Sequence, residues 1–137
     1  DTERSLAFYR DLLGLRVAGE SRNFGTEQEH LNNVEGARLR ITGLRSPAGP
    51  GIELLEYLSP TDGRAYPAGE RPNDLVHWQT TIQVRMLADL LSRLDSAAVP
   101  VISRSASSAH PPAGNPEGHT GVLVRDPDGH VLQLVDR

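Results

Sequence analysis

The chain of 137 residues repeats one pattern of elements, and this repeat limits its fold more than any other feature. A constant shift places the end of a helical segment, Leu13–Leu15, on Ala97–Val99, and the strand candidate at 37–42 on 121–126. Each half therefore consists of a helix, a strand and a hairpin. Self-similarity of this kind indicates two copies of one supersecondary unit.

Hydrophobic periodicity and turn residues define the expected elements of each copy. Apolar residues at helical spacing predict a helix over 1–13, capped by Asp1 or Thr2 and ended by Gly14. Leucines at the same spacing predict a second helix over 87–94. The expected strands are 15–20, 37–44, 51–58, 76–84, 100–104, 119–125 and 130–136. A helical turn, a small-residue loop and a hairpin turn are expected at 27–33, 105–118 and 126–129.

The strand at 76–84 precedes the helix of the second half and has no counterpart in the first half. We expect this counterpart on the strand that would precede Asp1, so that both halves are βαβββ modules. Alternatively, the first module lacks that strand, which leaves a sheet edge open. The sequence thus predicts an α+β fold with module one at 1–58, a linker at 59–75 and module two at 76–137.

The residue types that the chain lacks exclude several kinds of chemistry. Without cysteine there is no thiol nucleophile, disulfide or zinc–thiolate site, and without lysine there is no Schiff-base mechanism. A net charge of -4 and the lack of a basic stripe disfavour a nucleic-acid partner. No apolar run is long enough to cross a membrane, and nothing resembles a signal peptide. A cytoplasmic domain is the expectation.

Three segments resemble the vicinal oxygen chelate superfamily of glyoxalases, bleomycin resistance proteins and extradiol dioxygenases. They are DTERSLAFYRDLLGLRV (1–17), GIELLEYLSP (51–60) and VRDPDGHVLQLVD (124–136). The resemblance implies two βαβββ modules whose sheets curl into an open cup. It also implies homodimerisation and a divalent metal in the cup, with one ligand from the first and one from the last strand of each module.

These implied ligand positions can be read one by one. The first precedes Asp1, and the second falls on Glu53, whose carboxylate stands in an otherwise apolar strand. Burying a carboxylate is unfavourable unless it is paired or bound to metal. Glu53 is therefore either a metal ligand or catalytic acid/base, or the ion-pair partner of Arg38 or Arg40.

The other two positions carry glutamines. The third falls on Gln79, with His77 two residues earlier, a distance of about 6.5 Å along a strand. A small register shift would bring His77 to the metal; otherwise it is an ordinary strand-entry histidine. The fourth falls on Gln133, where many metal-dependent members carry glutamate. A glutamine cannot act as a base, so it is a neutral ligand, a substrate contact or a hydrogen-bonding residue of the cup.

Two arginines and a tyrosine complete the candidate site. We expect Arg38 and Arg40 to project to the side of Glu53 and to bind a substrate carboxylate or phosphate, or else to pair internally. Tyr57 shares a strand face with Glu53 and would line the cup.

Two functions follow from the resemblance. The first is a small-molecule enzyme, a lyase, isomerase or dioxygenase, with Ni, Zn, Mn or Fe held by Glu53 and His77. The metal would act on two adjacent substrate oxygens as a Lewis acid. The second is a metal-free protein that binds a small molecule or sequesters an antibiotic, because two of the three readable ligand positions carry no charge.

Overall fold

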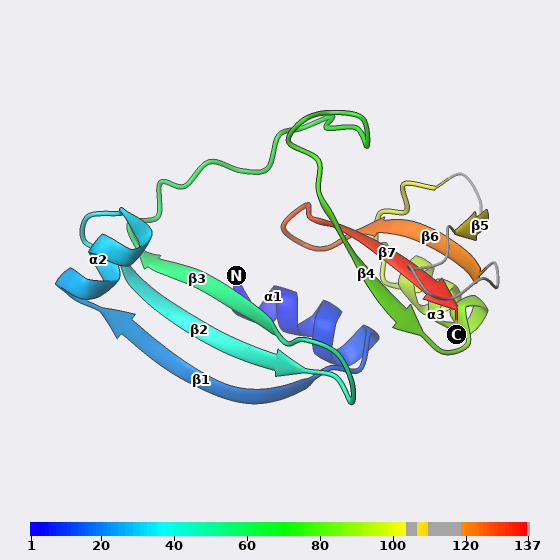
Figure 1. Cartoon of the computed structure of the whole chain (residues 1–137), viewed down its shortest axis with the longest axis horizontal. Coiled ribbons are helices and arrows are strands. Elements are labelled where there is room, and N and C mark those ends of the chain that lie inside the picture. Colours follow the sequence, from blue (N-terminus) through cyan, green and yellow to red (C-terminus); the bar gives the residue numbers. More distant parts are fainter. Residues whose placement is uncertain (104–106, 110–118, 137) are drawn as a thin grey trace. The chain divides into compact units, whose positions relative to one another are not determined.

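The computed structural model describes residues 1–103, 107–109 and 119–136, which form two compact units, Asp1–Ala65 and Tyr66–Arg137 (Figure 1). Each unit combines helical structure with one small sheet, so the α+β class predicted from the sequence is confirmed. The closure of both sheets into one cup stays a prediction, as does the strand before Asp1.

The first unit is a three-stranded antiparallel sheet with three helical segments. Its strands pair in the order β1-β2-β3. The elements in chain order are the helix α1 (Thr2–Leu6), the π-helical segment η1 (Ala7–Leu12), β1 (Arg16–Phe24), α2 (Thr26–Asn32), β2 (Arg38–Arg45) and β3 (Ile52–Ser59). β1 continues four residues beyond the predicted strand, since residues 21–24 also pair along β2.

The ends of the first helix follow the sequence signals. The side chain of Asp1 accepts a hydrogen bond from the backbone N–H of Arg4 at 3.0 Å, which confirms the N-cap. Gly14 has a φ of +80°, the left-handed conformation that ends a helix and that glycine adopts without strain. Between these ends, Phe8 and Tyr9 are buried and meet edge to face at 5.0 Å.

The second unit is a four-stranded mixed sheet with one helix. Its strands pair in the order β4-β7-β6-β5, and the β4–β7 pair is parallel. The elements are β4 (Gln79–Val84), α3 (Leu87–Ser96), β5 (Ser107–Ala109), β6 (His119–Arg125) and β7 (Val131–Asp136). The hairpin turn at 126–129 is confirmed, with Gly129 at a φ of +99°.

Two predicted segments of the second unit were wrong in part. The strand expected at 100–104 is reduced to one bridge between Val101 and Val124, because Ile102 and Ser103 both donate to the carbonyl of Leu123. The loop expected at 105–118 contains β5, which pairs with β6. The rest of that loop lies outside the described residues.

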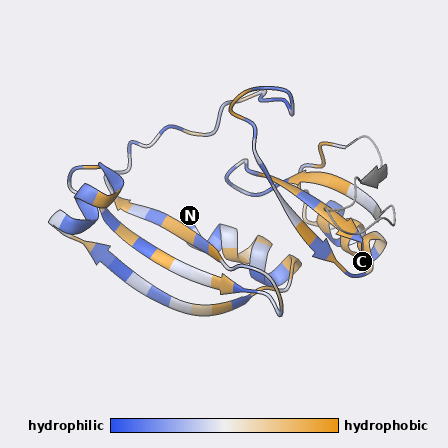
Figure 2. Cartoon of the chain, in the orientation of Figure 1, coloured by the Kyte–Doolittle hydropathy of each residue, from blue (hydrophilic) through white to orange (hydrophobic). Residues whose placement is uncertain are grey.

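The core of the second unit is formed by apolar residues of β6, β7 and α3. Leu134, Val124 and Leu94 have no exposed surface, and Leu90 of α3 is also buried. In Figure 2, β6 and β7 are largely hydrophobic, whereas β1 of the first unit is largely hydrophilic. This difference matches the burial of β7 and the exposure of β1.

The segment from Tyr66 to Trp78 belongs to the second unit, although most of it was expected to be linker. Tyr66 packs against the hairpin turn so closely that a Cβ added to Gly129 would lie 3.0 Å from the Cβ of Tyr66. The strand expected from residue 76 begins only at Gln79, so His77 and Trp78 precede β4. This arrangement gives the folded segment a role in placing His77.

Candidate functional site

The two faces of the first sheet have different surroundings. In the β2–β3 register, Arg40 lies opposite Glu56 and Gly43 opposite Glu53, so Arg40 and Glu53 project to opposite faces. The face of Arg40 and Glu56 meets α1, since Thr2 donates a hydrogen bond to Glu56 at 2.8 Å. Glu53 is therefore on the face that α1 leaves open.

The expectation that Arg40 projects to the side of Glu53 is wrong. Arg40 donates hydrogen bonds to Glu3 at 2.9 Å and to Glu20 at 2.6 Å, and its guanidinium lowers the pKa of Glu20 below the usual value. Arg38 lies over the ring of Phe24, with its Cζ 5.7 Å from the ring centroid. Neither arginine neutralises Glu53, which removes the ion-pair explanation of that carboxylate.

Glu53 lies exposed near the start of the edge strand β3, on a partly apolar sheet face. Leu55 and Tyr57 alternate with it along β3 and face Ile41 and Leu39 of β2. Within the part of the chain that the structure describes, Glu53 has no hydrogen-bond or ion-pair partner. A carboxylate with free oxygens beside apolar side chains is available to a ligand.

The two candidate glutamines meet on one face of the second sheet. Thr81 of β4 pairs in register with Gln133 of β7, and its hydroxyl donates to Gln133 Oε1 at 2.9 Å. Gln79 Nε2 lies 3.5 Å from the same oxygen. The sequence reasoning placed both glutamines at one site, and the parallel β4–β7 pairing brings them together.

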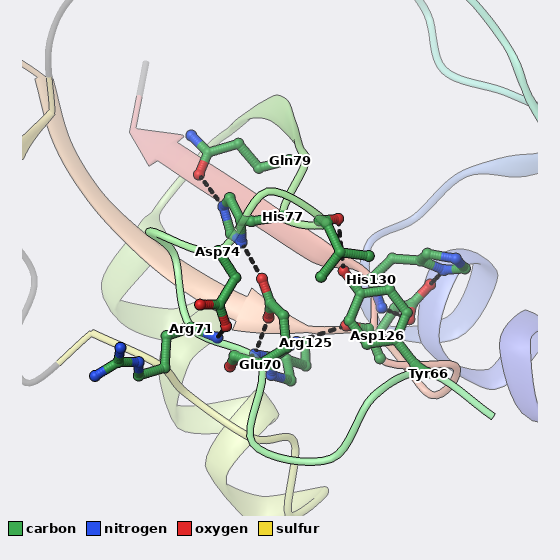
Figure 3. A network of polar contacts seen from close by, with 11 residues as sticks. Tyr66, Glu70, Arg71, Asp74, His77, Gln79, Arg125, Asp126 and His130 are labelled. Atoms are coloured by element: carbon green, nitrogen blue, oxygen red, sulfur yellow. Dashed lines mark hydrogen bonds and ion pairs between the residues drawn. The ribbon is translucent and has the colours of Figure 1, made fainter.

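His77 adjoins these glutamines through one ring nitrogen and a buried carboxylate through the other. Its Nε2 lies 3.4 Å from Gln79 Oε1, and its Nδ1 lies 2.6 Å from Glu70 Oε1 (Figure 3). The His77 side chain is only 11% exposed. A carboxylate only accepts hydrogen bonds, so Nδ1 of His77 carries the proton.

Glu70 is the residue that sequence reasoning missed. Its side chain has no exposed surface, and Arg125 Nη2 donates to its Oε2 at 2.5 Å. This hydrogen bond lowers the pKa of the Glu70 carboxyl, although burial acts in the opposite direction. Glu70 lies in the Pro/Gly-rich segment, where no periodicity marks a buried position. The one available signal was an acidic residue among turn residues.

A second histidine, His130, contacts the two ends of the segment that carries Glu70 and His77. His130 Nδ1 lies 3.1 Å from Asp126 Oδ2, and the hydrogen bond to Asp126 raises the pKa of His130. The ring of His130 lies between those of Tyr66 and Trp78, at centroid distances of 5.8 and 5.2 Å. These contacts hold both ends of the segment that carries Glu70 and His77.

The donor atoms of the second unit fit part of a divalent metal site. Imidazole nitrogens and oxygens bind divalent ions such as Zn²⁺, and a ligating histidine usually has its other nitrogen held by a carboxylate. With the proton on Nδ1, Nε2 is the ring nitrogen that a metal could use, and Gln79 Oε1 lies 3.4 Å from it. Among the described residues no three His, Asp or Glu side chains form a metal-binding group.

Comparison with known proteins identifies the family. The model of the Glyoxalase/Bleomycin resistance protein/Dioxygenase superfamily matches residues 1–134, so the chain belongs to this superfamily. No curated protein matches the sequence. In the described part of the chain, no helix is long and apolar enough to cross a membrane.

Three solved structures illustrate the shared fold. A glyoxalase family protein from Bacillus cereus is 17% identical, with a TM-score of 0.81 over 99% of this chain and 86% of that one. The trypanothione-dependent glyoxalase I of Leishmania major is 20% identical, with a TM-score of 0.59 over 99% and 78%. A lactoylglutathione lyase from Agrobacterium tumefaciens is 16% identical, with a TM-score of 0.51 over 99% and 85%. At these identities the likeness concerns the fold.

Proposed function

We propose that the chain is a small-molecule enzyme of the superfamily, a lyase, isomerase or dioxygenase, that uses a divalent metal, Ni, Zn, Mn or Fe. The proposed ligands are Glu53 and His77, with Gln79 and Gln133 as neutral ligands or substrate contacts. The observation that carries the proposal is the imidazole of His77, held through Nδ1 by a buried carboxylate and presenting Nε2 toward Gln79. The glyoxalase I and lyase neighbours agree with an enzyme of this class.

Different residues of the chain would bind the metal and the parts of the substrate. When bound, the metal would supply a Lewis acid for two adjacent oxygens of the substrate. The hydroxyl of Thr81 donates to Gln133 Oε1. The amide N–H groups of Gln133 are then able to donate to a substrate oxygen. Leu55 and Tyr57 offer apolar surface beside Glu53 to the hydrocarbon part of the substrate.

The glutamine at position 133 limits the reaction. Proton abstraction next to a carbonyl needs a base, and an amide cannot accept that proton. In our proposal, a lyase or isomerase reaction therefore uses the carboxylate of Glu53 as its base. A homodimer and a cytoplasmic location are part of the same proposal, on the grounds of the superfamily and the sequence.

Metal titration tests the proposed function. Purified protein is titrated with Ni²⁺, Zn²⁺, Mn²⁺ and Fe²⁺ against a chromogenic chelator, and Glu53→Gln and His77→Ala are compared with wild type. For a metal that wild type binds, we expect each of the two substitutions to weaken binding by more than about tenfold. Glu20→Gln is the matched control, because Glu20 is a strand glutamate paired with Arg40. If wild type takes up none of the four metals, the proposal is wrong.

A further inference from the structure

We infer that Glu70 is a positioning residue that fixes the ring tautomer and the orientation of His77, and that Arg125 holds Glu70 in place for this purpose. The inference deepens the proposed function and rests on it, because there Nε2 of His77 is the metal ligand. Its basis is the geometry of three side chains from two distant segments of the second unit.

Arg125 leaves the Glu70 carboxylate little freedom to rotate. Its Nη2 donates to both Glu70 Oε2 and the backbone carbonyl of Glu70, at 2.5 and 2.8 Å. Its Nη1 donates to the carbonyl of Gly129 at 2.8 Å, which ties the guanidinium to the hairpin turn. Figure 3 shows Glu70 between Arg125 and His77. One carboxylate oxygen is therefore used by Arg125, and the other is directed at the ring of His77.

His77 needs this partner because it precedes the sheet. Its backbone N–H donates to the backbone carbonyl of Asp74 at 3.0 Å, within a turn, and β4 begins only at Gln79. The ladder of the sheet therefore does not fix the ring. The contact with Glu70 fixes it instead, since the 2.6 Å bond requires a proton on Nδ1 and leaves Nε2 beside Gln79 Oε1.

The substitution Glu70→Gln tests the inference because the new side chain keeps the shape but has one acceptor only. Arg125 is a pure donor, so the amide oxygen must face Arg125. The amide N–H₂ group then faces Nδ1 of His77 and donates to it. We expect the proton of the His77 ring to move to Nε2, where it blocks the metal-binding lone pair.

The tautomer is read directly from the long-range ¹H–¹⁵N correlation spectrum of the metal-free protein, at a pH where the ring is neutral. The signals of His77 are assigned by their loss in His77→Gln, because the chain has 5 histidines. Wild type should show a protonated Nδ1, and Glu70→Gln a protonated Nε2. Metal affinity should fall by about 10–100-fold, the usual effect of removing an outer-shell partner. The control Glu20→Gln should change neither quantity.

A double variant separates positioning from a general loss of structure. In Glu70→Gln combined with Arg125→Met, no donor competes for the amide oxygen, so it can accept from Nδ1 and restore the wild-type tautomer. A purely structural role of Glu70 predicts no such rescue. The inference is overturned if wild type carries the proton on Nε2, if Glu70→Gln leaves the tautomer unchanged, or if metal affinity is unaffected by the switch. Failure of wild type to bind metal would refute the proposed function alone, since the tautomer is measured without metal.

Discussion

The contact between Tyr66 and Gly129 determines whether the segment that carries Glu70 and His77 is seated on the second sheet. In Gly129→Ala, the new Cβ would lie 3.0, 3.1 and 3.3 Å from the Cβ, Cγ and Cδ1 atoms of Tyr66. Overpacking of this kind costs about 1–3 kcal/mol. The φ of +99° adds about 1–3 kcal/mol of backbone strain for a residue other than glycine. We therefore expect the substitution to lower the free energy of unfolding by about 2–6 kcal/mol.

Equilibrium unfolding in urea measures this change. The single tryptophan, Trp78, lies in the second unit, so its fluorescence follows the unfolding of that unit. Gly129→Ala is compared in wild type and in Tyr66→Gly, which removes the atoms that the new methyl group would meet. Only the backbone strain should remain in the second background, so the two costs should differ by about 1–3 kcal/mol. Equal costs in both backgrounds would refute the packing of Tyr66 on the turn and, with it, the seating of the segment.

Three further predictions concern the second unit. Leu134→Ala should destabilise it by about 2–5 kcal/mol in the same assay, because Leu134 has no exposed surface; a cost near zero would contradict the assigned core. The bond to Asp126 raises the pKa of His130 in the folded protein. This bond therefore stabilises the fold fully below about pH 6.5, the usual histidine pKa. The stabilisation is lost as the pH rises through the raised pKa. In His130→Gln, the free energy of unfolding should therefore depend less steeply on pH above about 6.5. An unchanged slope would show that the titration of His130 does not contribute to stability. Gln133→Glu should tighten divalent-metal binding in chelator competition, because a carboxylate adds charge while still accepting from Thr81; weaker binding would exclude position 133 from the metal site.

The sequence by itself determined most of the helices and strands and part of the candidate site. Helical spacing, the cap at Asp1 and the left-handed Gly14 are local signals, and the structure agrees with all three. The resemblance to the superfamily also placed Gln79 and Gln133 at one site, and the β4–β7 pairing brings them together. The cap and the helix end were predictable because each depends on residues that are close together in the sequence.

Only the tertiary structure decided which face of each strand is covered and which distant residues meet. The β2–β3 register separates Arg40 from Glu53, and the packing of α1 decides that Arg40 faces the helix and Glu53 the open side. Glu70 and Arg125 are 55 residues apart in the chain, and no local pattern connects them. Their pairing arises because a buried carboxylate needs a charged donor, and only the folding of the linker segment onto the sheet supplies one.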